Sequence, residues 1–318
     1  MASNEGAEAT MTTPRGACLG LALALIALPS GPARSANPAE KATLRWKLKE
    51  GQVLRYAMNQ NTISTGQDLE GREVKQTIGL IMDMTWTVKG VAPSGVASLA
   101  LSIDRLRTSA TAPFGKFSFD SKEAGAATGA AGPLFKMLVG AEFTAKLDAQ
   151  GRMTDVKLSE KLLATLQGGD EPAGAQGQFS EVGLKNMIEQ MVLPLPDAPV
   201  DLGATWKRDL AIPSGADGQT RKVEQDFTYK GPVPAPAAGL EAVEFLTKFD
   251  PPKADPNVPV VFKKEAATGR YEFDKDAGVV ARSTVSEDVE VAITVQGKEI
   301  PQKVETSRVL TLTKDKAP

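Results

Sequence analysis

Long stretches of the chain alternate between hydrophobic and polar residues with a period of two. In the stretch 73–90 the apolar residues of one phase are Val74, Ile78, Leu80, Met82, Met84, Trp86 and Val88. A helix would scatter these side chains around its surface, whereas a strand places them on one face. The intervening positions are mostly polar. One apolar and one polar face indicate an antiparallel sheet with one side in water.

The same alternation predicts strands along most of the chain. They are expected at 43–49, 53–64, 73–90, 96–108, 115–120, 142–147, 152–158, 204–212, 220–231, 239–249, 269–274, 279–295 and 300–313. Apolar residues at helical spacing predict short helices at 133–139, 159–167 and 180–192. The expected fold class is mainly β. It is a long curved antiparallel sheet, an open or half barrel, with two or three short helices on its concave apolar face.

The stretch "AEFTAKLDAQGRMTDVKLSEKL" at 141–162 predicts a hairpin followed directly by a helix. Phe143, Ala145 and Leu147 share the inward phase of the first strand. Gly151 sits where the turn demands a positive φ, and Ser159 is a helix N-cap. We expect the hairpin to be structural, because it delivers a helix to the concave side of the sheet.

The first 35 residues have the features of a signal peptide. Arg15 precedes the apolar run "CLGLALALIAL" at 18–28, which is too short to span a bilayer, and "ARS" at 33–35 offers small residues for cleavage. A start at Met11 gives a more typical n-region. We therefore expect an exported protein, periplasmic or extracellular, whose mature chain has no transmembrane segment. Cleavage would also remove the one cysteine, Cys18.

Behind a linker at 36–42, the rest of the chain is expected to form a single all-β domain, 43–318. A weak internal sequence similarity suggests two related halves, 43–195 and 196–318. "GQVLRYAMN" from Gly51 resembles "GATWKRDLA" from Gly203. Any strand–turn–strand unit shares such features, so both descriptions stand.

The residue types and motifs that the sequence lacks exclude most classes of catalytic mechanism. The chain has no histidine, which removes Ser-His-Asp catalysis and histidine-ligated metal sites. It also lacks S-x-x-K and G-x-S-x-G motifs. "DKDAG" at 274–278 begins like a calcium loop but fits a hairpin turn better. We therefore expect no enzyme, no catalytic residues, no metal and no cofactor. The net charge of −2 gives no footprint for nucleic acid.

Several stretches carry a family resemblance. "VGAEFTAKLDAQGRMTDVKLSEKL", "LRWKLKEGQVLRYAMNQNT", "MDMTWTVKGV" and "FSEVGLKNMIEQ", with a later G-x-x-W at Gly203 and Trp206, resemble a family of uncharacterised exported bacterial proteins carrying a domain of unknown function (DUF6263-like). The likeness covers most of the chain after residue 35. It implies architecture and export, and no functional residues. More distantly, one-sided strands with helices on the apolar side look like the open barrels of periplasmic lipoprotein carriers, a fold-level analogy.

Three function classes follow. The first is a non-enzymatic cell-envelope protein that binds an apolar small molecule, such as a lipid, between sheet and helices. Its expected ligand-binding residues share one face of the helix 180–192: Leu184, Met187, Ile188 and Met191. The commoner role of such a face is solid core. The second class is a structural component that docks an envelope protein. The third is a carboxylate-dependent hydrolase.

Overall fold

The computed structural model describes residues 41–113, 115–123, 132–168, 181–213, 220–237, 239–250, 260–295 and 297–313. The predicted signal peptide with Cys18, most of the linker 36–42 and the expected helix start at Ser180 lie outside these residues. Among the described residues, no helix is both long and apolar enough to cross a membrane.

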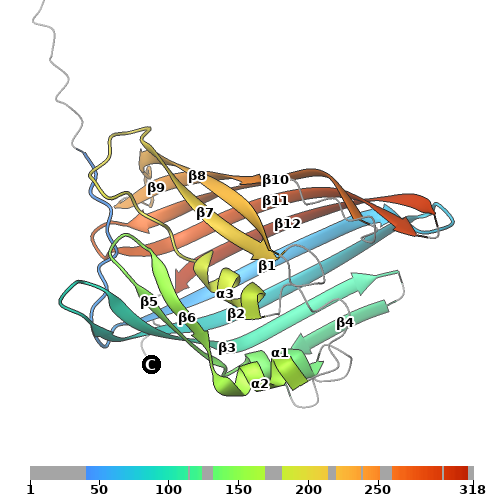
Figure 1. The fold of residues 1–318 in the computed structure, drawn as a ribbon, viewed down its shortest axis with the longest axis horizontal. Helices are drawn as coiled ribbons and strands as arrows, with labels where there is room; N and C mark the ends of the chain where they lie inside the picture. The colour runs from blue at the N-terminus through green and yellow to red at the C-terminus, as the bar shows by residue number, and fades with distance from the viewer. Residues whose placement is uncertain are drawn as a thin grey trace, which may run out of the picture. The chain divides into compact units, whose positions relative to one another are not determined.

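The described residues form one antiparallel sheet with three short helices, which confirms the predicted fold class (Figure 1). Its strands are β1 (Val53–Gln67), β2 (Glu73–Val91), β3 (Ala97–Ala112), β4 (Gly115–Asp120), β5 (Glu142–Leu147), β6 (Met153–Leu158), β7 (Thr205–Pro213), β8 (Thr220–Pro232), β9 (Leu240–Phe249), β10 (Val260–Asp274), β11 (Val279–Val295) and β12 (Lys298–Thr313). The order is β6-β5-β3-β2-β1-β12-β11-β10-β9-β8-β7, with β4 beside β3. The sheet is open, and β6 and β7 are the ends of this path.

The first and last strands meet in the middle of the sheet. β1 pairs with β12 along most of its length, with Met58 opposite Leu310, and with β2 on its other side. Both Met58 and Leu310 are buried. The centre of the sheet therefore joins the two ends of the described chain.

Burial follows the predicted parity in β2. Met84 and Trp86 are buried, whereas Thr85 and Thr87 lie on the opposite face. The apolar phase continues to Ile78, but that side chain is 38% exposed. The buried core therefore ends before the sheet does.

Each of the three helices contributes a leucine to the buried core. α1 (Gly132–Leu138), α2 (Glu160–Gly168) and α3 (Glu181–Glu189) supply Leu138, Leu162 and Leu184. The predicted cap of α2 is confirmed, because the Leu162 amide donates a hydrogen bond to the Ser159 hydroxyl at 3.4 Å.

Helix α3 ends earlier than the predicted 180–192, because Pro194 has no N–H to offer the Gln190 carbonyl, and side chains of the sheet bond the carbonyls that follow the helix. The Tyr271 hydroxyl donates to the Gln190 carbonyl at 2.9 Å, and the Arg208 guanidinium donates to the Val192 carbonyl at 3.0 Å. The backbone there turns away from the helix. α3 itself contacts both edge strands, β6 and β7, and Asn186 donates to the Ala211 carbonyl of β7 at 2.7 Å. The helix thus bridges two strands that do not pair with each other.

The predicted β5–β6 hairpin is present, and the "T-D-V-K" stretch forms an irregular part of it. Gly151 has φ 76 in the turn, as expected, and Phe143 and Leu147 are buried. Asp155 adopts φ 54 where the pairing shifts register, and its carboxylate lies 2.7 Å from the Lys146 ammonium. Asp tolerates this backbone region better than most residues. "T-D-V-K" therefore marks a bulge.

Two predictions about strands were wrong. Residues 43–49 are not a strand: Leu44 and Trp46 are buried, but the Trp46 amide bonds the Ala149 carbonyl and the Lys47 amide bonds the Gly278 carbonyl. The segment crosses the turns of two hairpins, so its alternating burial comes from packing and not from ladder pairing. The other error is the strand at 269–274, which is the end of a longer strand starting at Val260.

Candidate ligand cavity

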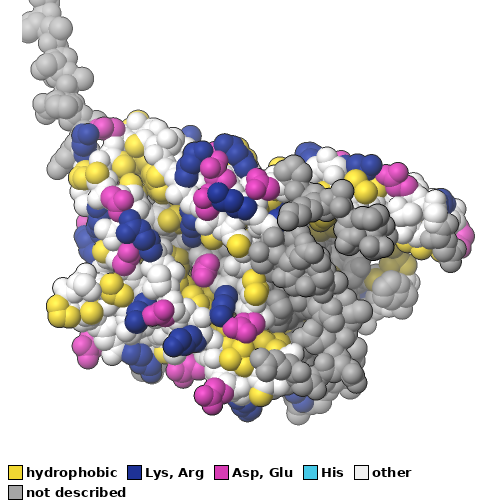
Figure 2. All heavy atoms as spheres, in the orientation of Figure 1, with side chains coloured by type: hydrophobic (Ala, Val, Ile, Leu, Met, Phe, Trp, Pro, Cys, Tyr) yellow, Lys and Arg dark blue, Asp and Glu magenta, His cyan; other side chains and the backbone are white. Residues whose placement is uncertain are grey.

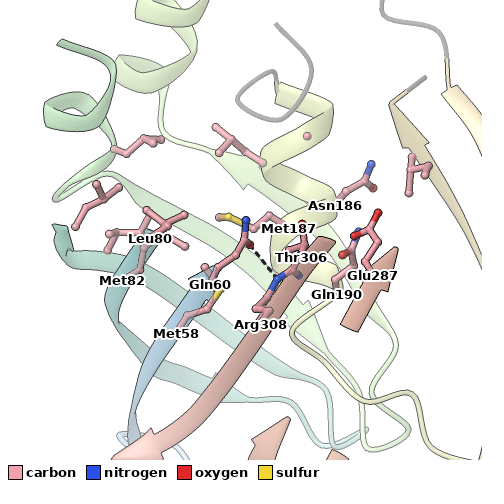
Figure 3. Close-up of a pocket in the computed structure, with 16 residues that line it drawn as sticks. Met58, Gln60, Leu80, Met82, Asn186, Met187, Gln190, Glu287, Thr306 and Arg308 are labelled. Atoms are coloured by element: carbon pink, nitrogen blue, oxygen red, sulfur yellow. Dashed lines mark hydrogen bonds between the residues drawn. The ribbon is translucent and has the colours of Figure 1, made fainter. Parts of the chain in front are cut away.

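A cavity of about 360 Å³ lies between α3 and the concave face of the sheet (Figure 3). Its apolar lining consists of Met58, Leu80, Met82, Ile103, Leu106, Leu138, Leu184, Met187 and Ile212. Its polar lining consists of Gln60, Asn186, Gln190, Glu287, Thr306 and Arg308, and Gly183 completes it. The cavity is therefore amphipathic.

The alternation of side chains along each strand explains why these residues point into the cavity. β1 contributes Met58 and Gln60, and β2 contributes Leu80 and Met82, in each case residues two apart, which point to the same face. β12 contributes Thr306 and Arg308 in the same way, and Glu287 of β11 pairs with Thr306. Four of the six polar side chains thus come from the neighbouring central strands β1, β12 and β11, whereas Asn186 lies on α3 and Gln190 directly follows it.

The structure brings two of the four predicted ligand-binding residues to the cavity. Leu184 and Met187 line it. Ile188 and Met191 are buried in the core and are not part of the lining. The predicted helix face is therefore divided between cavity wall and solid core.

Two charged groups occupy the polar side. The Nε of Arg308 donates a hydrogen bond to Gln60 Oε1 at 3.2 Å (Figure 3). Burial lowers the pKa of the Arg308 guanidinium, and the nearby Glu287 charge works against that shift. Burial likewise raises the pKa of the Glu287 carboxyl, although Arg308 opposes it. Both charges are held where water solvates them poorly.

The sequence contained a signal for these polar residues that the prediction did not use. In the predicted strand 300–313, Thr306 and Arg308 have the same parity as the apolar Leu310 and Leu312. A charged residue in the inward phase of a strand marks either a buried ion pair or a polar site. Glu287 gives the same signal, because it stands between Val285 and Val289 in the apolar phase of the predicted strand 279–295.

Other surface features offer less to a ligand. Two larger depressions, of about 800 and 880 Å³, are more open and are lined mainly by polar and charged side chains. In the view of Figure 2, Lys and Arg side chains are interspersed with Asp and Glu. In the described part of the chain, no group of three or more Cys, Asp or Glu side chains could hold a metal ion.

The protein is therefore an open antiparallel sheet with an amphipathic cavity that a helix covers.

Residues 94–231 match a family of unknown function (DUF6263), which confirms the predicted resemblance over that range. The match includes the β5–β6 hairpin, α3 and Trp206. It leaves out two of the stretches that carried the resemblance, "LRWKLKEGQVLRYAMNQNT" at 44–62 and "MDMTWTVKGV" at 82–91, so it is narrower than the expected likeness. Among curated proteins no match is found.

Solved structures give distant likenesses. Lipovitellin, from a study of its lipid–protein interactions, shares 12% identity and a TM-score of 0.48 over 86% of this chain. This chain spans 26% of the lipovitellin chain. DynF of dynemicin biosynthesis from Micromonospora chersina shares 8% identity, with a TM-score of 0.21 over 90% of this chain and 92% of its own. The translocator domain of the autotransporter NalP from Neisseria meningitidis shares 11% identity, with a TM-score of 0.20 over 83% of this chain and 89% of its own.

Proposed function

We propose that this protein is a non-enzymatic binding protein that holds one apolar ligand, such as a lipid acyl chain, between α3 and the sheet. The observation that carries the proposal is the cavity itself. Its volume lies within the range of small-molecule sites, roughly 300–1,000 Å³. Met58, Met82 and Met187 all line it, and methionine adapts its shape to irregular apolar partners.

The proposal includes export to the cell envelope. It is supported by Arg15, the apolar run 18–28 and the small residues at 33–35. A protein outside the cytoplasm that sequesters an apolar molecule would carry it through water. N-terminal sequencing of the protein from its envelope fraction checks this point, with a start near Ala36 expected.

Native mass spectrometry and ligand titration test the binding function. Protein purified without detergent from cells expressing the full chain should carry a mass excess that is lost on denaturation. It should also bind an environment-sensitive fluorescent fatty acid at micromolar concentration. Met187→Trp fills the cavity and should abolish probe binding. Val182→Trp on the same helix is the control, because Val182 is 42% exposed and does not line the cavity.

The same measurements can contradict the proposal. A bare polypeptide mass together with no probe binding would eliminate it. The protein would then be better described as a structural or protein-interaction component of the envelope.

One observation favours a second candidate, a carboxylate-dependent hydrolase. Glu287 pairs with Ala267, so Glu265 is its diagonal neighbour, at a distance of about 7–8 Å between Cα atoms. Side chains at such positions can bring their carboxyl groups to the separation of roughly 5–10 Å that glycoside hydrolases use. However, Arg221 binds both oxygens of Glu265. Turnover of a nitrophenyl glycoside panel that disappears in Glu287→Gln would support this candidate.

A further inference from the structure

Three arginines on the concave face of the described strands are held in different ways. Arg208 of β7 donates to Gln225 and to the carbonyls of Glu189 and Val192. Its role is to fix the chain that follows α3. Its guanidinium is committed to protein acceptors.

Arg221 of β8 is equally committed. Both terminal nitrogens bind the Glu265 carboxylate, and the guanidinium lies between the rings of Phe249 and Phe262, 5.0 and 5.1 Å from their centroids. Ion pairing and stacking together leave this side chain no room for a ligand. Arg221 is therefore structural as well.

Arg308 differs from both. Within the described part of the chain, its hydrogen bond is the one from Nε to Gln60, and no carboxylate lies within 4.0 Å of it. Glu287 is its diagonal neighbour on β11, through the pairs Val285–Arg308 and Glu287–Thr306. The side chain lines the cavity, beside Met58 and Thr306 (Figure 3). The two terminal nitrogens are thus available on the cavity side.

From this contrast we infer that the ligand carries an anionic oxygen headgroup, a carboxylate or a phosphate, and that Arg308 binds it. The inference rests on the proposed binding function. A planar guanidinium matches such groups with two parallel hydrogen bonds. The Arg308 guanidinium is partly buried and forms no ion pair with a described residue, although Glu287 lies diagonal to it. An anionic headgroup would pair with it directly, whereas a wholly apolar ligand would not. The methionines and leucines that line the rest of the cavity would cover the hydrocarbon tail.

The size of the cavity limits the tail. At about 360 Å³ it lies near the lower end of small-molecule sites, roughly 300–1,000 Å³. It therefore suits a single-chain amphiphile better than a lipid with several chains.

Calorimetric titration with three twelve-carbon ligands tests the inference. The probes are dodecanoate, dodecyl phosphate and the neutral 1-dodecanol, added to protein purified from cells expressing the full chain and freed of lipid. At least one anion should bind the unaltered protein about tenfold or more tightly than the alcohol, because a charged hydrogen-bond pair distinguishes them. The better of the two anions identifies the headgroup.

Substitutions assign that preference to Arg308. Arg308→Met should remove the preference for the anion while binding of the alcohol persists, and Arg308→Lys should restore part of it. Arg282→Met, an exposed position on the neighbouring strand β11, is the matched control and should keep the preference. Circular dichroism and thermal unfolding establish that each variant is folded.

The outcomes separate the inference from the proposed function. If acid, phosphate and alcohol all bind equally, or if Arg308→Met still prefers the anion, the inference is wrong although binding stands. If none of the three binds the unaltered protein, the proposed function fails with it.

Discussion

The indole Nε1 of Trp46 donates a hydrogen bond to the carbonyl of Leu193 at 3.0 Å, and the bond passes over Gly151 in the β5–β6 turn. A Cβ on Gly151 would lie 2.2 Å from the Leu193 oxygen and 2.8 Å from the indole nitrogen. Three distant segments thus meet at one glycine: the crossing segment 41–49, the hairpin turn and the chain after α3. Gly151 is required here both for its positive φ and for its lack of a side chain.

Gly151→Ala should lower the free energy of unfolding by about 2–5 kcal/mol, because it combines backbone strain with loss of the buried hydrogen bond. Urea denaturation measures this. Gly95→Ala is the matched control: its φ is +84, but no atom would lie within 4 Å of the new Cβ. It should cost about 1–2 kcal/mol. Equal losses in both variants would show that the close approach does not matter.

Trp86→Ala should cost about 3–5 kcal/mol, the range for emptying a large core site. Trp86 is 1% exposed and its ring centroid lies 5.1 Å from that of Tyr56. Thr85→Ala, on the opposite face, loses a hydrogen bond to Asp104 and should cost about 1 kcal/mol or less. The reverse ranking in chemical denaturation would place the strand one residue out of register.

Met187→Ala and Ile188→Ala should separate binding from stability. Met187 lines the cavity and is partly buried, so its loss should weaken retention of a fluorescent fatty acid at modest cost in stability. Ile188 is 3% exposed in the core, and its truncation should cost about 2–5 kcal/mol. Parallel probe titrations and thermal scans check both. If Met187→Ala destabilises as much as Ile188→Ala and binds the probe unchanged, the whole helix face is core.

Glu287→Gln should stabilise the protein at neutral pH. Burial raises the pKa of the folded-state carboxyl above its ordinary value of 4.5; the Glu265 charge adds to this shift, and Arg308 and Arg221 oppose it. The stability associated with the protonated form is present below about pH 4.5 and is lost as the pH rises through the folded pKa. The glutamine stays neutral, so the variant should have the higher Tm at pH 7 and a similar Tm at pH 4.

Glu290→Gln is the control for this pH dependence. It lies on the other face of β11, 3.7 Å from Lys264, and its substitution should not raise the Tm at pH 7. Equal destabilisation by Glu287→Gln at both pH values would mean that Glu287 stabilises through hydrogen bonds in either state.

Strand alternation predicted most of the sheet because burial on one face repeats every second residue. It failed at 43–49, where an extended segment packs on two turns and shows the same alternation without a partner strand. It also missed the first part of β10, residues 260–268. "VVFKKEAAT" has no clear apolar phase, since it lies towards the end of the sheet that the core does not cover.

The cavity was harder to predict than the sheet. Helical spacing identified Leu184 and Met187, yet the same spacing included Ile188 and Met191. Periodicity shows which residues share a helix face, but not which of them contact a cavity and which contact the packed core. The polar side was missed because Gln60, Glu287 and Arg308 come together only through the β1–β12–β11 pairing. Pairing between residues this far apart in the chain is not visible in a single sequence.

The central position of β12 also governs how the protein can fold. Arg55 pairs with Thr313, a contact between strands at opposite ends of the described sequence. Contacts of such large sequence separation slow folding, because loop-closure entropy is lost before they form. During synthesis, the sheet pairing that connects the β1–β6 half to the β7–β11 half forms only after β12 leaves the ribosome. Until then β1 and β11 both expose unpaired edges, to which a chaperone can bind.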